Sequence, residues 1–209
     1  MKMAFSKEKW QYFFSVFGHP MDTFYWIRRQ EKGSVPIAIL LVFLFGCSFS
    51  ANRLLSSFLV NDVDPRGVNS LFEVLGVMLF YLLICVSNWS ITSLMEGEGR
   101  MKDIAIAIGY GTFPMTIAMI LSTIVSQFLD LDGAAFYTLI IVVGIAYGAI
   151  VMICGIMTVH NFSLGKTVVT LLLTFLAMLI IIFIILLVAN MISMVVMFFR
   201  SVYTELVYR

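Results

Sequence analysis

Long runs of apolar residues dominate this chain, and the polar residues fall mostly between them. Five runs are long enough to cross a bilayer, because a hydrocarbon core of roughly 30 Å needs about 20 residues of helix. These runs lie at about 36–60, 71–95, 104–129, 136–159 and 168–199. Strands that cross an outer membrane are shorter and alternate apolar with polar residues. The pattern therefore predicts an all-α integral membrane protein, built as a five-helix transmembrane bundle.

The charged residues avoid these runs. Arg53 and Glu73 are the two exceptions, as expected when a charge at the membrane midplane costs at least about 2.5 kcal/mol. Of the whole chain, 61% is apolar and 12% is charged, with a formal net charge of +1. A soluble domain carries about 25% charged residues, and a nucleic-acid binder shows a basic surface. The composition therefore excludes both classes. Arg53 and Glu73 lie toward the outer ends of their spans, where a mutual ion pair and separate snorkelling to water are equal alternatives.

The basic residues predict how the chain is oriented. Five spans place the two termini on opposite sides of the membrane. With the N-terminus inside, nine of the 13 Lys and Arg residues lie on the cytoplasmic side, as the positive-inside rule requires. The predicted topology is N-in and C-out, with a cytoplasmic segment at 1–34, a transmembrane domain at 35–199 and a short outer tail at 200–209. The first apolar run begins too late for a secretory signal peptide, so we expect none.

The N-terminal segment contains two short amphipathic helices. The first has an apolar face made of Trp10, Phe13, Phe14 and Phe17. The second runs from about Asp22 to Gly33 and places aromatic residues beside Arg28 and Arg29. Such sequences are typical of helices that lie in the inner membrane interface. They either anchor the bundle, which is the simpler interpretation, or dock a partner. The pattern leaves open whether they lie on the membrane or pack beneath the bundle.

Polar residues gather near the inner ends of spans two and three. Because consecutive spans are antiparallel, four of these residues are expected at similar depth and in one cluster: Asn88, Thr92, Tyr110 and Thr112. Such a cluster either holds the two helices together, at about 0.6 kcal/mol per hydrogen bond, or lines a substrate or ion path. None of the four titrates near neutrality, which favours the first interpretation. Pro114 in span three removes one helical hydrogen bond and predicts a kink.

Small residues predict where two spans pack most closely. Gly144, Gly148 and Gly155 share one face of span four, with a spacing that lets helix backbones approach each other. Span three offers a matching stripe of small residues, namely Ala107, Gly111, Ala118 and Ser122. We expect the two stripes to face each other within one molecule, and a dimer face is the alternative.

The connection between spans two and three holds the densest group of charges in the chain. It contains Glu96, Glu98, Arg100, Lys102 and Asp103. A solvated turn is the simplest interpretation of this loop. If the protein has a docking surface for a cytoplasmic partner, the sequence places it here, beside the amphipathic segment.

The residue types needed for catalysis are scarce. His19 and His160 are too few and too far apart for a metal site, and the zinc-protease and serine-hydrolase motifs do not occur. Cys47, Cys85 and Cys154 lie within spans, without a paired Cys-x-x-Cys motif. We therefore expect no enzyme, no cofactor and no metal. A membrane enzyme would have to use Glu73 or His160.

Several segments resemble a known family. They are Gly18-His19-Pro20 with Phe24 and Ile27, and the stretches at 96–103, 109–114 and 158–163. Together with an N-terminal cytoplasmic segment and five spans, they resemble the Yip family, named for membrane proteins that interact with Ypt/Rab GTPases, and within it the bacterial branch.

The resemblance implies a non-enzymatic scaffold or accessory protein, associated with a membrane transport or trafficking complex. Its expected surroundings are a lipid bilayer, namely the bacterial plasma membrane, with another membrane protein or a second copy as partner and no nucleic acid. The short tail lacks the long polar extension of many eukaryotic relatives. From the residues alone, the alternative is a small transporter or permease component that uses the polar face between spans two and three.

Overall fold

The computed structural model describes residues 7–61, 63–130 and 133–208, and within these ranges it contains helices and no strand. The elements are α1 (Lys7–Gly18), α2 (Pro20–Gln30), α3 (Val35–Leu55), a 3₁₀ turn η1 (Pro65–Gly67), α4 (Ser70–Leu94), α5 (Met101–Ser126), α6 (Ala134–His160) and α7 (Leu164–Val207). Five of them, α3 to α7, are long and apolar enough to cross a membrane. The predicted all-α fold with five candidate spans is therefore confirmed.

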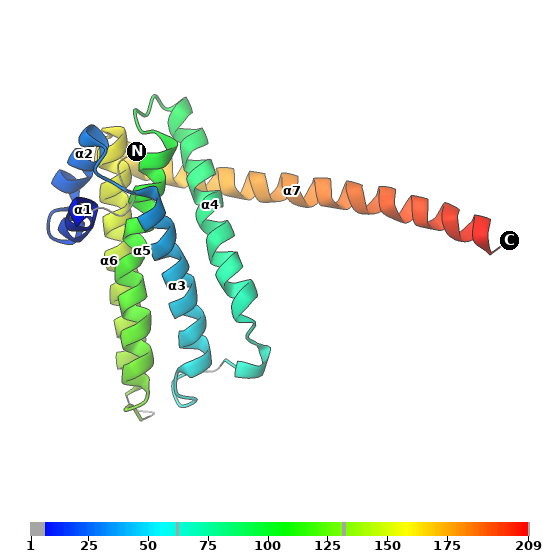
Figure 1. Ribbon diagram of the computed structural model, residues 1–209, viewed down its shortest axis with the longest axis horizontal. Helices are drawn as coiled ribbons and strands as arrows, with labels where there is room; N and C mark the ends of the chain where they lie inside the picture. Colours follow the sequence, from blue (N-terminus) through cyan, green and yellow to red (C-terminus); the bar gives the residue numbers. More distant parts are fainter. Residues whose placement is uncertain (1–6, 62, 131–132, 209) are drawn as a thin grey trace.

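Helix α5 is the centre of the fold, and α3 and α6 pack along it (Figure 1). Its small residues let neighbouring backbones come close. A Cβ atom added to Gly109 would lie 2.6 Å from the Cβ of Ala38 on α3, which is closer than real Cβ contacts come. Pro114 lies inside α5, and the helix continues beyond it to Ser126.

The glycine face of α6 lies against the small stripe of α5. A Cβ atom at Gly144 would meet the Cβ of Ala118 at 2.0 Å, and one at Gly148 would meet the carbonyl oxygen of Gly111 at 2.6 Å. At Gly155 the added atom would lie 2.8 Å from the Cβ of Ala107. Since the three glycines all meet α5 of the same chain, the structure uses this face for packing within one molecule.

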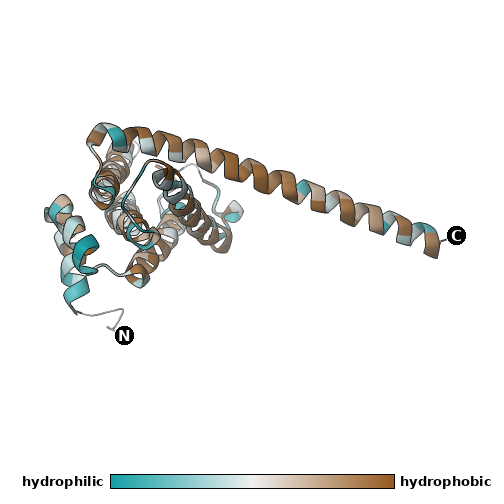
Figure 2. Cartoon of the chain, turned by 90° about the horizontal axis from the view of Figure 1, so that it is seen from above, coloured by the Kyte–Doolittle hydropathy of each residue, from teal (hydrophilic) through white to brown (hydrophobic). Residues whose placement is uncertain are grey.

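Helices α1 and α2 pack against the bundle itself, at the end where α4 connects to α5 (the inner end). Phe13 of α1 is fully buried, with its ring centroid 4.9 Å from that of Phe113 and 5.2 Å from that of Tyr110. Phe24 of α2 is also fully buried and lies over Gly155. Figure 2 shows this N-terminal pair as the most hydrophilic helices of the fold. Their apolar faces cover protein, although Phe14 and Trp26 stay exposed.

Helix α7 behaves differently from the other long helices. Its first turns pack on α4, where Thr170, Thr174 and Met178 are buried. From Leu179 to Tyr208 every residue except Ile181 is exposed. Figure 1 shows α7 leaving the inner end across the other helices and projecting far beyond them. Beyond Ile181 every described residue of α7 is exposed, so packing within the molecule holds only the first turns of this helix.

Candidate functional site

The inner end of the bundle carries a connected group of charges, which we call the inner charge cluster: Arg28, Glu31, Glu98, Arg100, Lys102 and Asp103. Its members come from the end of α2, from the α4–α5 connection and from the first turn of α5. Helix α2 ends at Gln30, and Glu31 follows in the left-handed region with φ of 52°. This sharp turn closes α2 beside the connection, so that carboxylates and guanidinium groups from distant parts of the sequence meet.

Ion pairs join the two segments. Arg28 pairs with Glu98, and Glu31 accepts hydrogen bonds from Lys102 at 2.7 Å and Arg100 at 2.8 Å. Arg100 also bonds Asp103 at 2.9 Å, where the carboxylate receives the backbone N–H of Arg100 in a capping arrangement at the start of α5. The connection that the sequence offers as a docking surface for a partner therefore contacts α2 of its own chain.

The same contacts shift the ionisation of the cluster. Hydrogen bonds from Lys102 and then Arg100 hold the pKa of Glu31 below its usual value, and Arg28 does the same for the pKa of Glu98. The hydrogen bond with Asp103 raises the pKa of Arg100. Each of these three shifts favours the charged form of Glu31, Glu98 or Arg100, so the ion pairs stabilise these charges.

His160, at the end of α6, holds the α4–α5 connection in place. The backbone N–H of Gly99 donates to Nδ1 of His160 at 3.2 Å. A Cβ atom at Gly97 would lie 2.5 Å from the same nitrogen, and one at Gly99 would lie 2.6 Å from Cε1 of the ring. The two glycines allow the loop to lie directly on the histidine. His160 is 1% exposed, and its Nε2 has no partner among the described residues.

The four polar residues predicted between spans two and three are all buried, but the structure does not bring them together. Asn88 donates to the hydroxyl of Thr174 on α7 at 3.0 Å. Tyr110 accepts from the backbone N–H of Ser34. Thr92 and Thr112 donate to carbonyl groups of their own helices. Among the described residues, the one bond inside this set joins Thr92 to the Asn88 carbonyl within α4. The groups tie α4 to α7 and α5 to the start of α3.

Sequence reasoning missed a buried group of hydrogen bonds near the outer ends of α3, α5 and α6. The side-chain amide of Asn52 donates to Ser122 Oγ at 3.0 Å and to Thr123 Oγ1 at 2.9 Å, and its oxygen accepts from the Tyr137 hydroxyl at 2.8 Å. Asn52 is 5% exposed. The sequence contains a signal for this contact, because Asn52 is the one amide in the first apolar run at 36–60.

The two charges inside the spans pair with each other. Arg53 Nη1 lies 2.5 Å from Glu73 Oε1. Of the two alternatives, the structure has the mutual ion pair. It ties α3 to α4 through Oε1 of Glu73, whose Oε2 is buried without a partner among the described residues.

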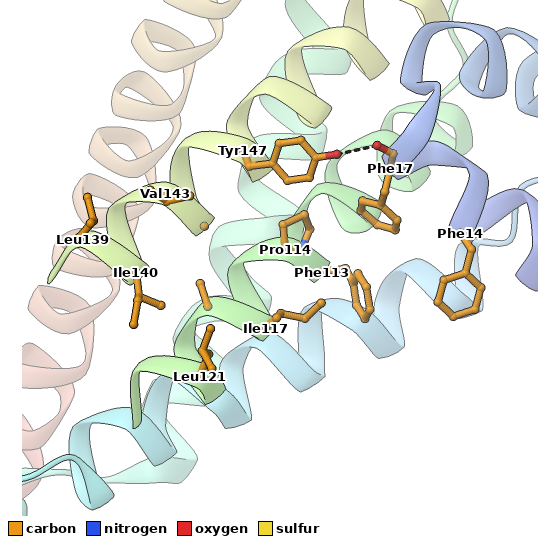
Figure 3. Close-up of a pocket in the computed structure, with 12 residues that line it drawn as sticks. Phe14, Phe17, Phe113, Pro114, Ile117, Leu121, Leu139, Ile140, Val143 and Tyr147 are labelled. Carbon is orange, nitrogen blue, oxygen red and sulfur yellow. Dashed lines mark hydrogen bonds between the residues drawn. The ribbon is translucent and has the colours of Figure 1, made fainter. Parts of the chain in front are cut away.

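An apolar groove lies on the side of the bundle between α5 and α6, closed at one end by Phe14 and Phe17 of α1 (Figure 3). Its volume is about 670 Å³. The Tyr147 hydroxyl, a polar group at its edge, donates to the Phe17 carbonyl at 2.6 Å. Within the described ranges, no group of three or more His, Cys, Asp or Glu residues could hold a metal ion.

Comparison with known proteins adds one finding. A family model described as the Yip1 domain matches residues 14–187, which is most of the chain. No curated protein and no solved structure matches.

Proposed function

The chain belongs to the Yip1 domain family, and we propose that it acts as a non-enzymatic scaffold or accessory subunit of a membrane complex. Five apolar helices and this family membership make it a multi-pass integral membrane protein. The finer role is argued from the helix that the rest of the chain leaves uncovered.

The observation that carries the proposal is the outer part of α7, from Leu179 to Val207. Figure 2 shows it as predominantly hydrophobic and distant from the packed helices. The apolar run at 168–199 would extend roughly 48 Å at 1.5 Å per residue, which exceeds a hydrocarbon core of roughly 30 Å. A helix of this length has more apolar surface than it needs to cross the bilayer, and α3 to α6 cover almost none of it.

Asn190 supports a protein partner for this helix. It lies in the middle of the outer part, is exposed, and has no hydrogen-bond partner among the described residues. A polar side chain in hydrocarbon is favoured when a neighbouring helix supplies its hydrogen bond. Ser193 lies three residues further on and shares its face. The occupant we propose is a transmembrane helix of another membrane protein.

A small transporter or permease component has less support. That function needs a polar face open to a substrate, whereas Asn88 and Tyr110 are used in bonds to α7 and to the start of α3. An enzyme would need a titratable group open to a substrate, whereas Glu73 is paired with Arg53 and His160 is 1% exposed beneath the α4–α5 connection. We place the protein in a bacterial plasma membrane, in a transport or trafficking complex, on the family resemblance.

The test is quantitative co-purification of the full chain in mild detergent. The variant Asn190→Leu/Ser193→Leu removes both polar groups from the outer part of α7. The control Met191→Leu/Met194→Leu changes neighbouring positions of the same helix without removing a polar group. We expect a membrane protein that is retained by the wild type and the control and is depleted severalfold in the variant.

Other outcomes are equally specific. If the species lost in the variant is a second copy of the chain, the scaffold is a homo-oligomer, and the proposed hetero-partner is wrong. If the protein alone in liposomes moves a substrate, the scaffold proposal fails and the transporter takes its place.

A further inference from the structure

Two adjoining cavities lie at the inner end, between α2, the α4–α5 connection and the end of α6. The first has a volume of about 240 Å³ and the second about 370 Å³. Arg28, Arg29 and Glu98 line both of them. For comparison, about 10–15 Å³ is enough to admit one water molecule. The space therefore accommodates a polyatomic group.

The walls of the two cavities carry more positive than negative charge. Arg28, Arg29 and Arg100 face one carboxylate, that of Glu98. Glu98 is paired with Arg28, and Arg100 is paired with Glu31 and Asp103. A cation remains after these pairs are made.

That cation is Arg29. Its guanidinium forms no hydrogen-bonded ion pair in the described part of the chain, although it lies close enough to Glu98 to help lower the pKa of that carboxyl, and it lies over the Tyr25 ring, 5.0 Å from the centroid. A guanidinium group presents five donors in a planar fork that suits phosphate oxygens, and stacking on Tyr25 holds the fork without using its donors.

The rest of the lining fits the same class of ligand. Thr158 and Asn161 also line the cavity, although they already donate hydrogen bonds to the Cys154 carbonyl and to Glu98, and Tyr25 and Phe162 add aromatic walls. Lys166 brings a further ammonium group to the rim, 4.2 Å from the Phe162 ring centroid. Asn161 is held in the left-handed region with φ of 56° at the end of α6. Basic groups from α2, the α4–α5 connection and the start of α7 thus surround the two adjoining cavities.

We propose that this cavity binds an anionic phosphate group, with Arg29 as its principal ligand. Two sources share this chemistry: the headgroup of an acidic phospholipid and free phosphate. The predicted N-in topology places the cavity at the inner membrane interface, where acidic lipids attract basic residues by about 1 kcal/mol each. This inference is independent of the partner proposed for α7.

The experiment uses the full chain in detergent, titrated with short-chain phosphatidylglycerol and followed by native mass spectrometry. Arg29→Gln should weaken binding about fivefold, the change that corresponds to roughly 1 kcal/mol. Arg29→Lys keeps the charge and should retain much of the affinity. Arg66→Gln removes the same charge from an exposed position in the α3–α4 connection and should change nothing. The thermal midpoint of each variant shows whether it is folded.

Parallel titrations distinguish the sources. Inorganic phosphate that displaces phosphatidylglycerol indicates a site for the phosphate group itself, and no displacement indicates a lipid headgroup site. The proposal is overturned if Arg29→Gln and Arg66→Gln bind phosphatidylglycerol equally well. It is also overturned if phosphatidylcholine, which has no net charge, binds as tightly as phosphatidylglycerol.

Discussion

Adding one methyl group at Gly144 should destabilise the contact between α5 and α6. The new Cβ atom would lie 2.0 Å from the Cβ of Ala118 and 3.3 Å from the carbonyl oxygen of Pro114. Ala118 has no longer side chain that could swing away, so the two helix backbones must separate. Forcing extra volume into a well-packed core typically costs about 1–3 kcal/mol. We expect Gly144→Ala to fall in that range.

A second substitution tests whether this contact is the cause. Ala118→Gly removes the clashing atom and leaves the nearest remaining neighbours of the new methyl group at 3.3 and 3.5 Å. The double variant should therefore recover most of the stability lost by Gly144→Ala, once the separate effect of Ala118→Gly is subtracted in a double-mutant cycle. Gly76→Ala is the matched control, because a Cβ atom there meets nothing within 4 Å.

The assay is thermal unfolding of the wild type and the four variants in one mild detergent. A change of 1 kcal/mol shifts the midpoint by about 2–4 °C for a chain of this length. Gly144→Ala should lower the midpoint clearly, and Gly76→Ala should not. The close approach of α5 and α6 at this point is refuted if Gly144→Ala and Gly76→Ala have the same unfolding midpoint. It is also refuted if adding Ala118→Gly to Gly144→Ala restores none of the lost stability.

Three further predictions concern the ends of the bundle. In the same unfolding assay, Asn52→Ala should lower the free energy of unfolding by about 1–3 kcal/mol, since it leaves buried hydrogen-bond partners unsatisfied. Tyr137→Phe removes one hydrogen bond and should lower it by only about 0.6 kcal/mol. Phe13→Ala should release α1, because truncating a fully buried Phe costs about 3–5 kcal/mol; faster proteolysis near Gly18 would show this, and unchanged cleavage would contradict it. The ion pairs lower the pKa of Glu31 in the folded protein. The stabilisation that Glu31 gives to the docking of α2 is therefore fully present above its unfolded pKa of about 4.3, and it is lost as the pH falls through the lowered, folded-state pKa. Amide exchange in α2 should rise at acid pH in the wild type and much less in Glu31→Gln.

The spans could be predicted because the bilayer imposes a simple rule. A helix in hydrocarbon must be apolar over its whole length, so length and hydropathy locate α3 to α7 without knowledge of their packing. The glycine face of α6 was predictable for a related reason. Gly144, Gly148 and Gly155 can approach another backbone, and α5 is the neighbouring helix with a matching stripe of small residues.

The position of individual polar groups could not be read in the same way. Depth along a helix places Asn88 and Tyr110 at similar levels, but it does not say which neighbour each side chain faces. Asn88 turns toward Thr174, a residue 86 positions away. Only packing determines that choice, and α7 reaches α4 by a crossing that the apolar pattern does not encode.

The amphipathic segment shows a second limit of sequence patterns. An apolar face on a short helix has the same appearance whether it covers lipid or protein. Phe13 meets Phe113 and Tyr110, and so the face predicted for the membrane interface is largely a protein contact. Arg28 of the same segment pairs with Glu98 of the α4–α5 connection. The amphipathic segment and the charged connection, which the sequence predicts as separate surfaces, therefore form one surface.

The central claim is that the outer part of α7 contacts another membrane protein, and photocrosslinking in intact membranes tests it most directly. A photoreactive residue at Met197, which shares the face of Asn190 and Ser193 on the outer part of α7 and is 69% exposed, is compared with one at Leu79, which is 65% exposed on α4. We predict a protein adduct of defined mass from Met197 that Asn190→Leu abolishes, and lipid adducts from Leu79. Lipid adducts alone from both positions would contradict the account.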